Sequence, residues 1–328
     1  MSNPLLVGVD LSRGWFDVAV SDGRTRRFEN DPEGHQSFIT WLRHPARVVV
    51  EATGTLGMDL ALALAGDPRC EVMVVNPRFV KGFAQAVAQR SKTDRADART
   101  ILAFAQRMPF EPWAPPAPAL IELRAIARRI ADLTVQRTAE RNRLAALRTS
   151  VAHSRLVAND LAVNIRHLER RTDRLVAEAL AVVQGDLSLS AAYRHITSVR
   201  GIAAKSAVQL LPELLVLPVD MTPKQWVAHA GLDPREYESG STVRHRVRIS
   251  KVGNVHIRRA LYMPALVAAR SEPHVRAFYN DLLARGKRPM VANVAVMRKL
   301  LHAIHGMLRH GADFQGHRFR AIPVTADP

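Results

Sequence analysis

Residues 4–10 read Pro-Leu-Leu-Val-Gly-Val-Asp, an apolar run that closes on an acid. A short continuous apolar run of this kind predicts a buried strand. Further strands are predicted over residues 15–21, 24–29, 47–51 and 71–75. The Asp22-Gly23 pair is a hairpin signal between two of these strands. Helical patterns follow over residues 33–43, 56–65, 77–87 and 94–107. A hairpin followed by strand–helix alternation predicts an α/β domain with a mixed sheet over residues 1–110.

Four acidic residues stand out against this pattern. Asp10 and Glu51 each end an apolar strand, and Asp94 and Asp97 lie three residues apart in Ser-Lys-Thr-Asp-Arg-Ala-Asp-Ala. On a helix, that spacing places both carboxylates on one face. Acids that end apolar strands are costly when buried without a partner, so we expect the four carboxylates to converge. Taken singly, each has an ordinary alternative, because Asp10 and Asp94 could be caps and Glu51 could face solvent.

Converging carboxylates suit phosphodiester chemistry. Two hard divalent cations about 3.5–4 Å apart can stabilise both the attacking and the leaving oxygen of an in-line displacement. Oxygen ligands favour Mg²⁺, and Mn²⁺ accepts the same ligands. Without a metal, four clustered carboxylates would repel one another. Lys92, Arg95 and Arg99 flank the acidic pair and either bind phosphate or form surface ion pairs.

A linker and a long helical region come next. Residues 109–118 contain five prolines, which is typical of a linker. Through residues 117–185, apolar residues recur in alternating steps of three and four, the pattern of a coiled-coil seam. One helix of about 60 residues would be roughly 90 Å long, and a break or hairpin near residues 152–159 fits the pattern equally well. The seam predicts either packing of the chain on itself or a homo-oligomer, a dimer or tetramer.

The positive charge is concentrated in one segment. The net charge is +17, and residues 240–310 alone carry 14 basic and 2 acidic side chains. A concentrated basic patch predicts binding to a polyanion, and arginine contacts phosphate bidentately. The sequence has no apolar run of about 18 residues and no signal-peptide pattern, which argues against a membrane partner. The single cysteine, Cys70, excludes an internal disulfide and indicates a reducing cytoplasm.

One C-terminal segment predicts a phosphate contact through a helical turn. Residues 196–215 form two short helices around Gly201, close to a helix-hairpin-helix, and Lys205 lies in the second helix. In that element the N–H groups of the turn and of the following helix bind phosphate without reading bases. An ordinary helical turn is the alternative, because Ala203 stands where the second glycine is usual.

A second C-terminal segment offers a nucleophile. The run Ser239-Gly240-Ser241-Thr242 has the composition of a polar turn, and a serine hydroxyl needs activation before it can attack. The basic cluster that follows could position a phosphate and stabilise the charge that develops on it. Tyr237 is a rival nucleophile, and His245 and His256 are candidate proton carriers or phosphate contacts. The cluster comprises Arg244, Arg246, Arg248, Lys251, Arg258 and Arg259.

With these segments in order, the chain resembles the DEDD-type insertion-sequence transposases, which include the Piv-type invertase and the recombinases guided by a bridge RNA. The N-terminal resemblance lies in Val-Gly-Val-Asp10, Val-Glu51-Ala-Thr-Gly and Lys-Thr-Asp94-Arg-Ala-Asp97-Ala. The C-terminal resemblance lies in Ala-Gly-Leu-Asp-Pro234-Arg-Glu-Tyr-Glu-Ser239-Gly240, then Arg-Ile-Ser-Lys-Val-Gly-Asn254 and Arg-Arg-Ala-Leu-Tyr262. It covers residues 4–310.

The resemblance implies a division of labour along the chain. Residues 1–110 would form a RuvC-like domain of the RNase H fold, with Asp10, Glu51, Asp94 and Asp97 as ligands of two divalent ions. Residues 190–312 would form a mainly helical transposase domain that supplies the serine nucleophile, by position Ser239, with Ser241 and Tyr237 as alternates. Residues 313–328 would be a tail.

The resemblance also implies partners. They are DNA, a structured noncoding RNA that selects target and donor DNA, and further copies of the chain, such that serine and carboxylates of different subunits meet. The expected location is the bacterial cytoplasm, at the nucleoid when DNA is bound.

Two other functions share part of this pattern. A RuvC-like structure-specific endonuclease would use the same carboxylates with water as the nucleophile and would not need Ser239. A non-catalytic architectural protein would need only the basic C-terminal half to bind DNA.

Overall fold

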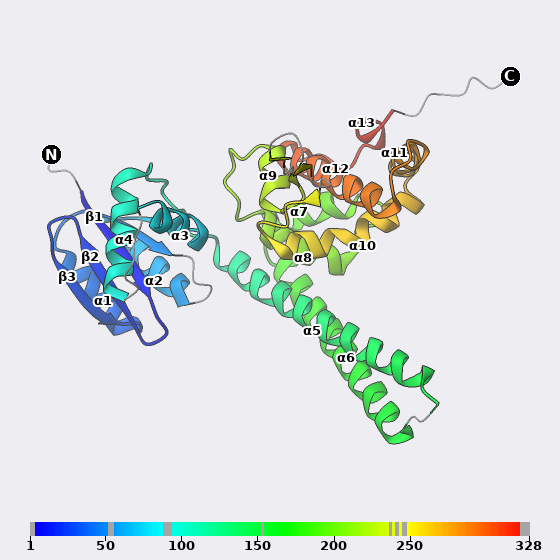
Figure 1. The fold of residues 1–328 in the computed structure, drawn as a ribbon, viewed down its shortest axis with the longest axis horizontal. Coiled ribbons are helices and arrows are strands. Elements are labelled where there is room, and N and C mark those ends of the chain that lie inside the picture. The colour runs from blue at the N-terminus through cyan, green and yellow to red at the C-terminus, as the bar shows by residue number, and fades with distance from the viewer. Residues whose placement is uncertain are drawn as a thin grey trace. The chain divides into compact units, whose positions relative to one another are not determined.

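The computed structural model describes residues 4–51, 56–87, 94–151, 154–235, 238–239, 243–244 and 248–321. The chain divides into two compact units, unit 1 (Met1–Pro115) and unit 2 (Pro116–Pro328). The division falls inside the proline-rich segment. In Figure 1, unit 1 runs from blue to cyan and unit 2 from green to red.

Unit 1 is built on a mixed sheet with the strand order β3-β2-β1-β4-β5. β1, β2 and β3 pair antiparallel as successive hairpins, whereas β4 pairs parallel with both β1 and β5. The expected mixed α/β sheet is therefore confirmed. The strands are β1 (Leu5–Leu11), β2 (Trp15–Val20), β3 (Thr25–Glu29), β4 (Ala46–Glu51) and β5 (Cys70–Val75).

Two helices, α1 (Pro32–Leu42) and α2 (Leu56–Ala65), cover one face of this sheet. Phe38 of α1 and Leu60 of α2 are fully buried in a cluster with the side chains of Val7, Val9, Val48 and Val50. α1 begins where it does because Asp31 accepts a hydrogen bond from the Gly34 N–H and proline occupies the first helical position.

The opposite face carries α3 (Pro77–Ala86) and α4 (Asp94–Arg107). Ile101 of α4 and Val80 of α3 pack there against Val49 and Val75. β4 is therefore apolar on both sides, which explains its continuous rather than alternating run of valines.

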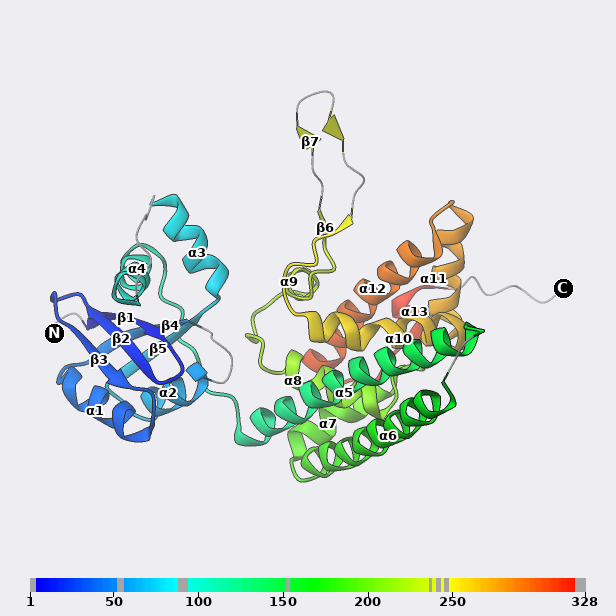
Figure 2. The same cartoon turned by 60° about the horizontal axis from the view of Figure 1, so that its bottom comes forward.

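Unit 2 starts with a pair of long helices, α5 (Pro118–Thr149) and α6 (Arg155–Gln184). They lie side by side and run in opposite directions, as Figures 1 and 2 both show. The helical region is thus interrupted between Thr149 and Arg155, which overlaps the start of the expected break at residues 152–159, and one uninterrupted helix is not formed. Glu169 of α6 bonds to Arg141 of α5 across the pair at 2.5 Å.

The remaining helices pack around the open end of this hairpin into one core. Fully buried leucines on successive helices, among them Leu211, Leu261 and Leu300, join α5 and α6 to the rest of unit 2. These helices are α7 (Leu187–Thr197), α8 (Ala204–Leu214), α9 (Pro223–His229), α10 (Val255–Ser271), α11 (Pro273–Ala284), α12 (Pro289–His310) and α13 (Gly316–Phe319).

Two short ribbons interrupt the helices between α9 and α10. β6 (Pro234–Arg235) pairs antiparallel with β9 (Arg248–Ile249), and β7 (Glu238–Ser239) pairs with β8 (Val243–Arg244). In Figure 2, β7 lies away from the helices of unit 2. A mainly helical domain was expected here without the ribbons, because strands of two residues leave no alternating pattern in the sequence.

Within the described part of the chain, no single helix has the length and apolar composition needed to cross a membrane. Only α6 and α7 taken together reach it, and they are bent by 119°.

Candidate active site

Strand register places Asp10 and Glu51 at the same level of the sheet. Val9 of β1 pairs with Val50 of β4 in parallel register, and the two acids are the next residue on each strand. Gly8 pairs with Val49, whose side chain packs against α4. Because every second residue of a strand points to the same face, Asp10 and Glu51 belong to the α4 face of the sheet.

Helix α4 lies directly on this face. A Cβ added to Gly8 would come within 2.3 Å of the Leu102 backbone N and within 2.5 Å of the Ala98 carbonyl oxygen. A side chain at position 8 would therefore push the helix away. Asp97 precedes Ala98 on the same helix and is partly buried, as are Asp10 and Glu51.

Electrostatics indicate that two of these acids lie close together. Burial raises the pKa of Glu51, and the negative charge of Asp97 raises it further. A cation beside the two carboxylates would relieve both effects. Asp10 and Asp97 each have interactions of their own with neighbouring groups.

A fifth carboxylate, Asp17, belongs to the same row and was missed by the sequence analysis. Asp17 pairs with Asp10 across β1 and β2 and with Arg27 across β2 and β3. The residue is only 2% exposed, and the Arg27 Nη2 donates to its carboxylate at 2.6 Å. Arg27 thus neutralises the charge of Asp17, and for this reason Asp17 is not counted among the candidate metal ligands. Its place inside a strand of otherwise apolar residues and the arginine on the next strand were the available signals.

The other predicted ligand lies at the margin of what the structure describes. Asp94 begins α4, but its side chain, like that of Arg95, is outside the described residues, and so is Lys92. Among the described side chains, no three acids, histidines or cysteines gather closely enough to hold a metal ion. The structure therefore brings Glu51 and Asp97 near each other, places Asp10 on their face, and leaves Asp94 as a prediction.

The candidate nucleophile is in the outer ribbon of unit 2. Ser239 belongs to β7, whose backbone pairs with β8, but its side chain is not described. Tyr237, Ser241, His245 and Arg246 also lie outside the described residues. The side chain of Arg244 on β8 is likewise not described.

The base of the ribbons is firmly attached to the helical body. The Ser250 hydroxyl donates to Asp233 at 2.5 Å, and the Lys251 N–H donates to the Gly231 carbonyl at 3.0 Å. The Asn254 N–H donates to the His229 carbonyl at 2.6 Å, so the two ends of the excursion are closed against α9. Asn254 then caps α10 by accepting from the N–H groups of His256 and Ile257.

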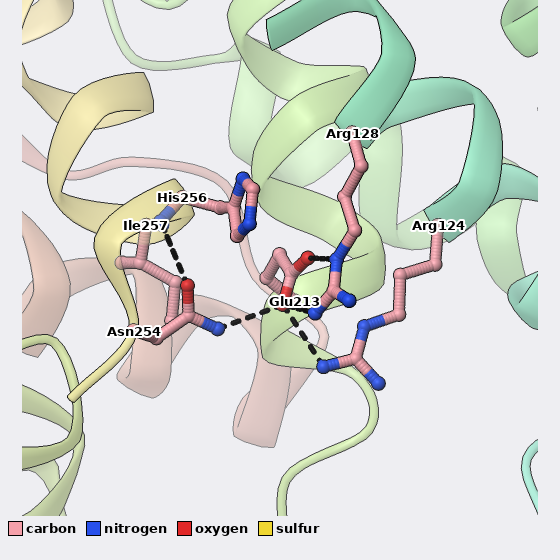
Figure 3. A network of polar contacts seen from close by, with 6 residues as sticks. All are labelled: Arg124, Arg128, Glu213, Asn254, His256 and Ile257. Atoms are coloured by element: carbon pink, nitrogen blue, oxygen red, sulfur yellow. Dashed lines mark hydrogen bonds and ion pairs between the residues drawn. The ribbon is translucent and has the colours of Figure 1, made fainter. Parts of the chain in front are cut away.

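A buried carboxylate links this cap to the long hairpin. Glu213 of α8 is 1% exposed and accepts hydrogen bonds from the Arg128 Nε at 2.8 Å, the Arg124 Nη2 at 3.1 Å and the Asn254 amide at 2.7 Å (Figure 3). Burial alone would raise the pKa of Glu213, but the bonds from Arg128 and the charge of Arg124 outweigh it and lower the pKa to about 2. This network was not predicted, because Glu213 sits inside an apolar helix.

The predicted phosphate contacts have different surroundings. Arg248, Lys251 and Arg259 are exposed. Arg258 donates to the Ala230 carbonyl at 2.6 Å and so has a structural role near the ribbon base. Burial lowers the pKa of Lys205, and the charge of Arg137 lowers it further.

The packing of the backbone explains why position 201 is a glycine. Gly201 has a φ of +118° between α7 and α8, and a Cβ there would come within 2.7 Å of the Ala268 N of α10. The glycine thus allows two backbones to approach closely. A phosphate contact at this turn stays a prediction.

A mixed sheet with carboxylates on one face, followed in the chain by a basic helical unit, suits an enzyme that acts on nucleic acid. Two family models match the chain, one described as transposase over residues 7–153 and one as transposase of the IS116/IS110/IS902 family over residues 193–280. The chain therefore belongs to the DEDD-type insertion-sequence transposases of the IS110 family, and it is an enzyme of DNA transposition and recombination. Its domain type implies an RNase H-like fold, use of divalent metal and DNA as a partner.

Curated relatives agree with this assignment. The chain is 26% identical to the pilin gene-inverting proteins of Moraxella bovis and Moraxella lacunata, over 94% of this chain and 97% of each relative. It is 25% identical to an insertion element IS110 uncharacterized 43.6 kDa protein of Streptomyces coelicolor, over 40% of this chain and 32% of that protein.

Proposed function

We propose that this transposase cuts and rejoins DNA with Asp10, Glu51, Asp94 and Asp97 as metal ligands and Ser239 as the nucleophile. The observation that carries the proposal is the interaction of Glu51 with Asp97 on the α4 face of the unit 1 sheet, where burial and then the charge of Asp97 raise the pKa of Glu51. Strand register puts Asp10 on the same face. Partly buried acids of like charge are unfavourable neighbours unless a cation binds between them. An architectural protein would have no use for this arrangement.

The donor set fits a hard divalent cation. All four proposed ligands are carboxylates, and oxygen donors suit Mg²⁺ or Mn²⁺ better than softer metals. A pair of such ions, when bound, would stabilise the charge on the attacking and leaving oxygens. In this proposal β1, β4 and α4 would hold the four carboxylates around the ions before substrate arrives.

Ser239 suits the role of nucleophile because the ribbons that include it have exposed cationic side chains in their stem. In the proposed step the Ser239 Oγ attacks the phosphorus, one phosphorus–oxygen bond to the DNA strand breaks, and the hydroxyl proton passes to the departing oxygen through a base. A later attack by a DNA hydroxyl reverses the step and releases serine. Arg248 and Lys251, which are exposed in the stem of the ribbons, would hold the phosphate.

The same proposal includes the partners of the reaction. A structured noncoding RNA selects target and donor DNA, and a homo-oligomer brings Ser239 and the carboxylates of different subunits together. The reaction takes place in the bacterial cytoplasm, at the nucleoid. The basic character of residues 240–310 supports binding to either nucleic acid.

The decisive experiment traps the covalent intermediate. A labelled DNA that carries the element's ends is incubated with the full chain, and protein–DNA adducts are resolved under denaturing conditions. We expect an adduct with the native chain and with Ser241→Ala and Tyr237→Phe, and its loss in Ser239→Ala. Asp97→Asn should lower the rate of adduct formation by roughly a hundredfold or more, because charge stabilisation is lost.

Asp59→Asn is the matched control for the carboxylate. Asp59 is exposed on α2, the helix that covers the opposite face of the sheet. If Ser239→Ala still cleaves DNA while Asp97→Asn does not, the enzyme is a hydrolytic nuclease. If recombination survives Asp10→Ala, the catalytic assignment is wrong altogether.

A further inference from the structure

A cavity of about 430 Å³ lies within unit 2, between α5, α8 and α10. Its lining combines small side chains on α5 and α10 with cationic, amide and imidazole groups. The small side chains include Ala127, Ala131, Ala139 and Ala260, and the polar ones include Arg128, Asn142, Gln209, His256 and Arg259. None of these residues belongs to the carboxylate site.

The charge of the cavity favours an anion. Glu213 lines it, but both oxygens of this carboxylate are already bound by Arg128, Arg124 and Asn254. Arg128 uses its Nε and Nη2 for Glu213, which leaves its Nη1 outside that pair. Arg259 is exposed and forms no hydrogen bond or ion pair with the described residues. Glu213 thus neutralises Arg128, and Arg259 leaves the lining with one positive charge in excess.

His256 adds an imidazole to this lining. Burial is the main cause that lowers its pKa, the charges of Arg128 and Arg259 act in the same direction, and Glu213 and Asp132 oppose them. Its Nδ1 is buried and, within the described part of the chain, without a hydrogen-bond partner. The ring packs beside Glu213 and Arg128 in Figure 3.

The row of lining residues on α5 favours an extended ligand strand. Ala127, Ala131, Val135 and Ala139 recur every fourth residue and form an apolar track along α5. Small side chains let a ligand backbone approach the helix closely. A sugar can rest on this apolar track while its phosphate meets the two arginines.

We propose that this cavity binds one phosphodiester and its sugar in the nucleic-acid strand that the transposase holds. The proposal rests on the proposed function for its partner, a nucleic acid. It adds a contact site on α5, α8 and α10, apart from the ribbon that carries Ser239.

The first test removes one charge. Binding of the full chain to a fluorescently labelled random-sequence DNA duplex is measured across a salt series, and the same is done with a labelled RNA strand. Arg259→Gln is expected to weaken binding roughly tenfold, the effect of losing a hydrogen bond to a charged group. The slope of log K against log salt should become shallower by about 0.9 with duplex DNA and by about 0.7 with a single strand. Arg285→Gln is the matched control, because Arg285 is exposed at the end of α11. It should weaken binding less than Arg259→Gln and change the salt slope less.

The second test fills the cavity without changing charge. Ala131→Leu should weaken binding severalfold at every salt concentration and leave the slope unaltered, because it blocks the track but removes no cation. Ala145→Leu, exposed further along α5, is the control. A loss with only one of the two probes would show whether the strand is DNA or RNA, and either result supports the site.

Two outcomes would overturn the inference. Equal binding by Arg259→Gln, Ala131→Leu and their controls would do so, as would an Ala131→Leu variant that loses self-association and keeps nucleic-acid affinity. In both cases the Ser239-dependent adduct would persist, so the proposed function would stand without this site. Failure of the native chain to bind either probe would instead refute the proposed function.

Discussion

At the scale of single residues, Glu213 carries a charge where water is almost absent. Its ionised form persists because Arg124, Arg128 and Asn254 together replace the lost hydration. Glu213→Gln would leave two arginines facing a neutral amide. We expect this change to reduce the free energy of unfolding of unit 2 by about 3 kcal/mol, measured by urea denaturation, since breaking a buried charge pair is costly. Glu178→Gln, at an exposed position of α6, should change it by less than about 0.5 kcal/mol; equal effects would contradict the role of the network.

The lowered pKa of Glu213 makes the stability of the folded chain depend on pH. Its pKa is lowered from 4.5 to about 2 on folding. The unfolded state therefore binds the proton more readily, and the stabilisation is complete above about pH 4.5 and lost as the pH falls toward about 2. At 1.36 kcal/mol per unit, the total is about 3 kcal/mol. The difference in urea midpoint between the native chain and Glu213→Gln should shrink over this range, and a constant difference would contradict the assignment.

At the scale of elements, the contact between β1 and α4 depends on the absence of a side chain at Gly8. Gly8→Ala would place a methyl group within 2.3 Å of the helix backbone. We expect the free energy of unfolding of unit 1 to fall by about 1–3 kcal/mol or more, as overpacking does. The rate of DNA cleavage should fall with it, because Asp97 moves with α4.

Gly14→Ala is the corresponding control, since a Cβ there meets nothing within 4 Å. Thermal unfolding and DNA cleavage would be measured for both variants in parallel. A Gly8→Ala variant as stable and active as Gly14→Ala would mean that α4 does not fix the site.

The elements of unit 1 could be predicted because their burial leaves a pattern in the residues. Runs such as Val48-Val49-Val50 are apolar on both sides, and both faces of the sheet are indeed covered. The break between α5 and α6 could not be decided, because the seam keeps its spacing on both sides of residues 150–154. Antiparallel packing of one chain on itself buries the same stripe that a second subunit would bury.

The candidate site could be predicted only in part for a similar reason. Asp10 and Glu51 end apolar runs and attract notice, whereas Asp17 and Glu213 are buried acids whose arginine partners lie on other elements. A partner 10 residues away on the next strand, or 85 residues away on another helix, has no local signature. Register and helix packing, which only the folded chain supplies, decide those pairs.

At the scale of the whole molecule, metal binding should stabilise the folded chain. A ligand at about 100 times its Kd adds about 2.7 kcal/mol to folding, so Mg²⁺ or Mn²⁺ should raise one unfolding transition by several degrees. Calorimetry with and without the metal tests this. Asp97→Asn should lose the shift and Asp59→Asn should keep it, and an equal shift in both variants would argue for a metal site elsewhere.

The anchored base of the ribbons has an evolutionary consequence. Asp233 and Ser250 are 17 positions apart and joined by a hydrogen bond, and the turn after Ser250 is hydrogen-bonded to α9. The two ends of the segment therefore stay fixed on the helices whatever residues lie between them. Lengthening a segment between fixed ends adds only about 0.6 kcal/mol of closure entropy per doubling. The segment between Asp233 and Ser250 can thus change in length over evolution while the helices that hold its ends stay unchanged.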